Sequence, residues 1–183
     1  MTLTNTQARY GSLSIALHWL MLILLAAVYA CIELRGIFPK DSAERDLMKT
    51  LHFMLGLTVF ALVWLRLLLK VSRPTPRIEP TPPAWQTGLA HLMHWALYAL
   101  MIGLPLAGWT ILSAADKPIP FYGLELPALV APDKDLAKFV KGWHEWFGAL
   151  GYWLIGLHAL AGLYHHYVVR DNTLLRMLAQ KND

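Results

Sequence analysis

The stretch WHEWFGALGYWLIGLHALAGLYHHY, residues 143–167, decides the fold that this chain can adopt. Most of it belongs to a run of 24 uncharged residues between Glu145 and Arg170. A helix rises about 1.5 Å per residue and a bilayer core is about 30 Å thick, so about 20 apolar residues cross it. The stretch is therefore long enough to span a membrane as one helix, and it carries histidines within that span.

Three further uncharged runs precede this stretch. They contain 23, 16 and 36 residues, at 10–32, 50–65 and 80–115. Four transmembrane helices are predicted, at about 14–34, 50–70, 89–113 and 143–168. The second is the shortest, and Arg66 is expected to extend its charged end to the headgroup region. The sequence thus predicts an all-α integral membrane four-helix bundle, one domain over residues 1–183, with both termini on the same side.

The composition excludes several other classes of protein. Apolar residues make up 56% of the 183 and charged residues 15%, whereas a typical soluble domain has about 25% charged residues. The single cysteine excludes a disulfide framework and a four-thiolate cluster. The net charge of +4 lies in short stretches between apolar blocks, which indicates contact with membrane lipid rather than nucleic acid. No glycine-rich phosphate loop or nucleophile elbow is present.

A cleaved signal peptide is an alternative interpretation of the first apolar block. Its 23 uncharged residues exceed the 7–15 apolar residues that are usual in such a peptide. His18 and Trp19 would also lie in its middle. We therefore interpret the block as a membrane span.

The positive-inside rule does not orient the bundle. With four spans, the segments on the side of the termini hold eight Lys and Arg residues, and the opposite segments hold eight. The rule counts these two residue types, so the count is equal. The charge pattern alone leaves the orientation open.

Ionisable residues inside a membrane span are rare and indicate function by default. His144 and His158 are 14 residues apart in the fourth block. At about 100° per residue the two project from one helix face, and they lie about 21 Å apart along the axis. This arrangement suits two prosthetic groups, one near each membrane surface.

Each group needs a second ligand from another helix. His52 opens the second block on the side where His144 lies, so these two form a pair by elimination. On the side of the termini, His18 and His94 lie at a depth similar to that of His158. The residues by themselves do not choose between His18 and His94.

Haem is the group that suits these ligands best. Zinc usually takes three or four protein ligands, and no Cys, Asp or Glu lies at a matching depth. Copper accepts imidazole as well, but haem uses two axial imidazoles between apolar walls, with small residues beside the macrocycle. The chain has no CxxCH sequence for covalent attachment. We predict two non-covalent haem b groups with histidine ligands to iron.

Several strings resemble the bacterial cytochrome b561 family of dihaem membrane cytochromes. They cover nearly the whole chain, and besides residues 143–167 they are ALHWL (16–20), ELRGIFPK (33–40), LHFMLGL (51–57), GLAHLMH (88–94) and DNTLLRM (171–177). The similarity is greatest to the superoxide oxidase type within that family.

The resemblance implies a specific ligand set and location. It implies that the axial ligands are His18, His52, His144 and His158, and it selects His18 over His94. The implied pairs are His18 with His158 and His52 with His144. It also implies a multi-pass protein of the bacterial inner membrane with both termini in the cytoplasm. The haem between His52 and His144 would then be the periplasmic one.

The resemblance further implies an oxidoreductase that transfers electrons from superoxide to ubiquinone across the membrane. The alternative is a cytochrome b subunit that links a periplasmic redox protein or a hydrogenase-like enzyme to the quinone pool. His165 is a candidate for binding the quinone, because it lies seven residues beyond His158 on the same face. Cations are expected near the periplasmic haem, where they would attract an anion: Arg35, Lys40, Lys49, Lys138 and Lys141.

Overall fold

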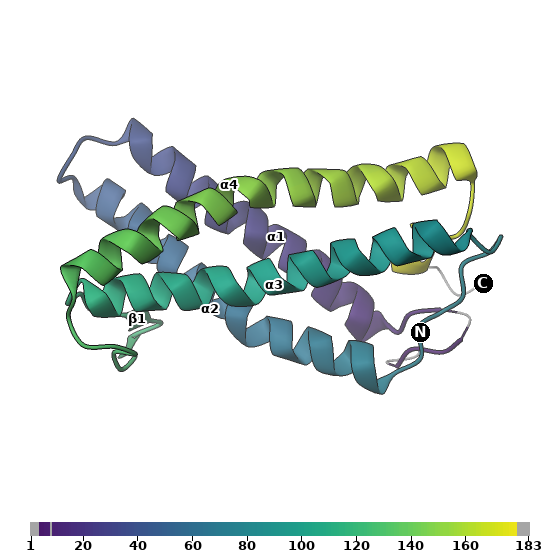
Figure 1. The fold of residues 1–183 in the computed structure, drawn as a ribbon, viewed down its shortest axis with the longest axis horizontal. Coiled ribbons are helices and arrows are strands. Elements are labelled where there is room, and N and C mark those ends of the chain that lie inside the picture. Colours follow the sequence, from purple (N-terminus) through teal and green to yellow (C-terminus); the bar gives the residue numbers. More distant parts are fainter. Residues whose placement is uncertain (1–3, 8, 179–183) are drawn as a thin grey trace.

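The computed structural model describes residues 4–7 and 9–178 and contains four long antiparallel helices (Figure 1). They are α1 (Ser12–Leu34), α2 (Ala43–Ser72), α3 (Ala84–Ala114) and α4 (Lys134–Tyr164). Each is long and apolar enough to cross a membrane. The prediction of an all-α, four-span membrane bundle is confirmed.

Two of the helices begin earlier than their apolar runs. α2 begins at Ala43, where the Ser42 side chain accepts a hydrogen bond from the Arg45 amide. α4 begins at Lys134, where Asp133 accepts bonds from the amides of the next two residues. Such side-chain caps satisfy amides that have no partner within the helix. Both helices therefore extend, as polar turns, beyond the apolar segments that the sequence indicates.

A short hairpin covers the end of the bundle opposite the termini. Its strands are β1 (Pro120–Phe121) and β2 (Leu124–Glu125), and they pair antiparallel. Ile119, just before β1, is buried against Leu57 of α2 and Leu112 of α3. A short 3₁₀ turn, η1 (Arg35–Ile37), follows α1 at the same end. The hairpin lies between α3 and α4 in the chain and packs against α2 and α3 at this end of the bundle.

The first and last described segments meet at the other end of the bundle (Figure 1). The Trp19 indole of α1 donates to the Met177 carbonyl at 2.7 Å, within the 3₁₀ turn η3 (Leu175–Met177). The Arg77 amide, in the connector between α2 and α3, donates to the Gln7 carbonyl at 3.1 Å. An intervening π-helical turn, η2 (His165–Val169), continues from α4. Both terminal segments therefore lie on the same side, as predicted.

Close packing is confined to certain pairs of helices. The backbone of α1 packs against α2, that of α2 against α3, and that of α3 against α4. A small cluster formed by Met21, Val59, Val63 and Tyr98 is buried among α1, α2 and α3. Neither α1 nor α2 packs its backbone closely against α4. The histidines lie between these more widely separated helices.

Candidate functional site

The first histidine pair lies toward the hairpin end, between α2 and α4. The ring centroids of His52 and His144 are 6.2 Å apart, and the ring planes are inclined by 77°. His52 Nδ1 lies 2.9 Å from the Val28 carbonyl oxygen of α1. A carbonyl only accepts, so His52 Nδ1 carries the proton and donates it, and Nε2 keeps a free lone pair. Metal-ligating histidines are typically oriented in this way by such a bond.

The partner ring has an unpaired nitrogen. His144 Nδ1 is buried and has no hydrogen-bond partner within the described part of the chain. An unsatisfied buried polar atom is costly in a native protein. If His144 ligated a metal through Nε2, Nδ1 would carry the proton, and the backbone of Leu104 in α3 is placed to accept it.

The second group lies nearer the termini and contains three histidines. The centroids of His18 (α1) and His158 (α4) are 6.2 Å apart, with the planes inclined by 69°. The ring of His94 (α3) lies 5.4 Å from that of His158, inclined by 70°. The structure therefore brings together both candidate partners of His158.

The centroid separations provide a test of fit to an axial pair. Two metal–nitrogen bonds of about 2.0 Å and two ring radii of about 1.1 Å place coaxial imidazole centroids about 6.2 Å apart. The pairs His52–His144 and His18–His158 have this separation. The His94–His158 separation of 5.4 Å is shorter. The spacing thus favours the pairing that includes His18.

Glycines leave open space beside three of the four rings. Gly56, Gly148 and Gly162 each follow a histidine of a pair by four residues, which places them one turn along the same helix face. A Cβ atom added at any of them would meet no atom within 4 Å. The open space suits a flat macrocycle better than a tightly packed core.

A non-haem metal centre has no comparable support. Over residues 4–7 and 9–178, no group of three or more His, Cys, Asp or Glu residues is arranged to hold a metal ion. The three imidazoles near the termini therefore do not converge on one point. The described residues therefore offer no ready site for a metal ion held by side chains alone.

Arg66 differs from the expectation that it extends to the headgroup region. Its Nη2 lies 2.9 Å from Nδ1 of His18, so the guanidinium points toward α1 within the bundle. Lys70, one turn further along α2, lies over the Tyr98 ring at 4.9 Å and the Trp95 ring at 5.7 Å. The expectation was wrong because an uncharged run gives the length of a span but not the direction of the side chain at its end.

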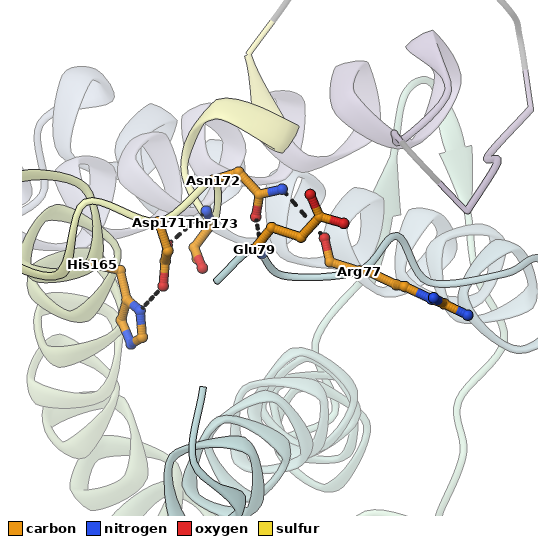
Figure 2. Close-up of polar contacts among 6 residues, drawn as sticks. All are labelled: Arg77, Glu79, His165, Asp171, Asn172 and Thr173. Carbon is orange, nitrogen blue, oxygen red and sulfur yellow. Dashed lines mark hydrogen bonds and ion pairs between the residues drawn. The ribbon is translucent and has the colours of Figure 1, made fainter. Parts of the chain in front are cut away.

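His165 belongs to a separate polar cluster at the termini end (Figure 2). Its Nδ1 lies 2.5 Å from Oδ2 of Asp171, a residue only 3% exposed. The other oxygen of Asp171 accepts from the Thr173 amide at 2.8 Å. Burial raises the pKa of the Asp171 carboxyl, but the hydrogen bonds from His165 and Thr173 outweigh it and lower the pKa below its usual range.

The backbone around this cluster is shaped to bring the two residues together. The π-helical turn η2 ends at Val169, and the next residue, Arg170, has a left-handed φ of 60° that reverses the chain. Asn172 then binds the connector between α2 and α3, because its amide donates to the Glu79 carbonyl and its Oδ1 accepts from the Glu79 amide (Figure 2). Sequence reasoning did not single out Asp171, although this residue opens the DNTLLRM string (171–177) that resembles the family.

Four apolar antiparallel helices with histidines between them define a helical membrane protein with interior sites for a prosthetic group. The family model of the prokaryotic cytochrome b561 matches residues 9–180. The chain belongs to this family. As a cytochrome of b type it carries haem b, and the histidine spacing, the bond from His52 Nδ1 to the Val28 carbonyl and the open space beside the glycines fit that group.

Individual relatives cover almost the entire chain. It is 40% identical to the cytochrome b561 homolog 1 of Escherichia coli over 173 residues, which are 94% of this chain and 98% of that protein. It is 41% identical to the probable superoxide oxidase CybB of Yersinia pestis, over 94% of this chain and 97% of that protein. The cytochrome b561 homolog 2 of Escherichia coli is 30% identical over all of this chain and 97% of its own length.

Proposed function

We propose that the chain holds two haem b groups, with His52 and His144 as axial ligands of one and His18 and His158 as ligands of the other. The observation that carries this proposal is the equal 6.2 Å centroid separation in both pairs. When bound, haem supplies the reversible one-electron oxidation and reduction that no side chain of the bundle provides. The pairs lie at opposite ends of the bundle, which suits electron transfer across the membrane.

The proposed reaction is the oxidation of superoxide coupled to the reduction of ubiquinone. Each superoxide loses one electron and becomes dioxygen, so two superoxide anions supply two electrons. One ubiquinone takes these electrons together with two protons and becomes ubiquinol. The Yersinia pestis relative, at 41% identity, is named a probable superoxide oxidase, which supports this substrate.

The side near His52 and His144 is proposed to receive superoxide and to face the periplasm. Among the residues described there, two of the expected cations have acidic partners: Lys49 lies 2.8 Å from Asp46, and Lys141 lies 3.5 Å from Glu145. Three others form no ion pair within the described chain, namely Arg35, Lys40 and Lys138. A locally positive surface raises the encounter rate of a small anion.

The side near His165 is proposed to reduce ubiquinone and to face the cytoplasm. His165 donates its Nδ1 proton to Asp171, which leaves Nε2 for the carbonyl oxygen of a quinone. When His165 is doubly protonated, Nε2 donates to that oxygen and transfers its proton as the quinone is reduced. Asp171 holds the ring in position through its contact with Nδ1.

A combined experiment tests the proposed function. The purified protein is analysed by a reduced-minus-oxidised spectrum and then given superoxide, with and without ubiquinone. We expect a b-type spectrum, rapid reduction of haem by superoxide, and reoxidation with formation of ubiquinol. If superoxide fails to reduce the haem while a chemical reductant succeeds, the protein is instead an electron-transfer subunit for another donor.

A further inference from the structure

Arg66 is a permanent cation inside a predicted membrane span, and it has no acidic partner in the structure. It lies in α2, is partly buried, and forms no ion pair with any described residue. An arginine at membrane depth is costly unless it is paired with an anion or interacts with water. Asp171, the buried acid at this end, already accepts from His165 and Thr173. A negative charge from outside the chain would balance Arg66.

The contact between Arg66 and His18 fixes the position of a proton. The guanidinium has five donors and no acceptor, so His18 Nδ1 accepts the 2.9 Å hydrogen bond. The proton of neutral His18 is then on Nε2. An imidazole that ligates iron through Nε2 has its proton on Nδ1 and donates it to an acceptor. Arg66 must therefore face a different partner when His18 is a ligand.

The haem itself carries the required anion. Its two propionate groups are carboxylates, and a guanidinium binds a carboxylate with two parallel hydrogen bonds. The other cation on this face of α2, Lys70, lies over the rings of Tyr98 and Trp95. Arg66 is the cation directly beside His18, so it is the one placed to bind a carboxylate of the haem ligated there.

We propose that Arg66 binds a propionate carboxylate of the haem between His18 and His158 and so raises the midpoint potential of that haem. The inference rests on the proposed function, because it needs haem ligated by this pair. A positive charge beside a haem favours the reduced form, which has one positive charge less. Arg66 would thus direct electrons toward the end of the bundle that contains His165.

The test compares the holoprotein with Arg66→Gln, Arg66→Lys and Lys70→Gln. Redox titration at one pH resolves the midpoint potentials of the two haems, and resonance Raman spectroscopy reports the propionate bending vibrations. For Arg66→Gln we expect the potential of one haem to fall by about 59 mV, which is tenfold in the equilibrium of a one-electron couple. The propionate vibration should shift as well, and the other haem should be unaffected.

The other two variants separate charge from geometry. Arg66→Lys keeps the charge but loses the paired donors, so the propionate vibration should shift while most of the potential is retained. The Arg66→Lys variant still tests the propionate contact if Arg66→Gln fails to fold. Lys70→Gln removes the same charge one turn away and should lower the potential less than half as much, without altering the propionate vibration.

Two results would overturn the inference. Unchanged propionate vibrations in both Arg66 variants would show that Arg66 does not bind the carboxylate. An equal fall in potential for Lys70→Gln would show a general charge effect instead. The variant His158→Ala separates failure of the proposed function from failure of this inference. If it keeps two haems, His158 is not a ligand and the proposed pair is wrong. If it loses one haem, the proposed pair is supported, and a negative result for the Arg66 variants then counts against the Arg66 contact alone.

Discussion

The two ends of the bundle hold histidine pairs of the same spacing in different polar surroundings. Both pairs have centroids 6.2 Å apart. At the hairpin end, His52 Nδ1 donates to the neutral Val28 carbonyl. At the termini end, His18 Nδ1 accepts from the charged Arg66, and a third imidazole, His94, lies close by. Equal histidine spacing can therefore accompany unequal electrostatics, and we expect the two proposed haems to differ in midpoint potential.

The largest expected effect concerns the independence of the two ends. The parent protein should contain two low-spin b haems per chain, and His144→Ala should contain one, because each ligand pair lies at its own depth. His158→Ala should also contain one haem, with the spectral features of the other site. A pyridine haemochrome assay against protein concentration measures both. A parent ratio near one would contradict the pairing.

The next effect tests which of two histidines completes the pair at the termini end. His18→Ala should lose one haem, whereas His94→Ala should keep both, because the 6.2 Å separation of His18 from His158 matches an axial pair and the 5.4 Å separation of His94 is shorter. Haem content and the low-spin absorption spectrum are the measurements. Loss of haem in the His94 variant with full content in the His18 variant would reverse the assignment.

A third prediction concerns a substitution that fills the open space at the hairpin end only. Gly56→Leu adds a side chain where no atom lies within 4 Å, one turn from His52. We expect at least half of the haem at the hairpin end to be lost while the other end is retained. Gly103→Leu is the matched control, since Gly103 is exposed on α3 and also has no atom within 4 Å of an added Cβ. Full haem content in the Gly56 variant would place the macrocycle elsewhere.

A smaller effect is expected on the rate of only one of the two reactions, the reduction of ubiquinone at the termini end. His165→Ala should slow ubiquinone reduction by about 10²-fold, the lower range for loss of general acid catalysis, and should leave haem reduction by superoxide unchanged. Asp171→Asn should cause a weaker loss, because the carboxylate acts through the ring. Stopped-flow absorbance follows the two phases separately. His166→Ala is the control, and an equal loss in that variant would argue against a specific role of His165.

The smallest expected effect is electrostatic. Reduction of haem by superoxide should slow as salt rises, because screening shortens the reach of surface charge to about 8 Å at 0.15 M. Lys138→Gln should lower the rate a few-fold and weaken its salt dependence, with haem content unchanged. Lys141→Gln should change the rate less, since Glu145 already offsets Lys141. A rate that does not depend on salt would remove the steering argument.

The sequence by itself determined the four helices and the positions of the histidines along them. Apolar run length and the rise of a helix suffice for this, because a bilayer requires about 20 apolar residues and a helix to satisfy their backbone. The helix period likewise placed His144 and His158 on one face of α4. These inferences depend only on local geometry, which residue order fixes. The polar beginning of α2 was missed because hydropathy does not register a capped polar turn.

Tertiary structure decided which side chains from different helices meet. It placed both His18 and His94 beside His158, turned Arg66 toward His18, and buried Asp171 against His165. None of these contacts follows from spacing, since each joins separate elements whose rotation and separation are set by packing. Arg66 and Asp171 owe their surroundings to the way α1, α2 and the segment after α4 pack at one end of the bundle. A linear pattern gives the depth of a residue in the membrane, and only the packed helices give its partner.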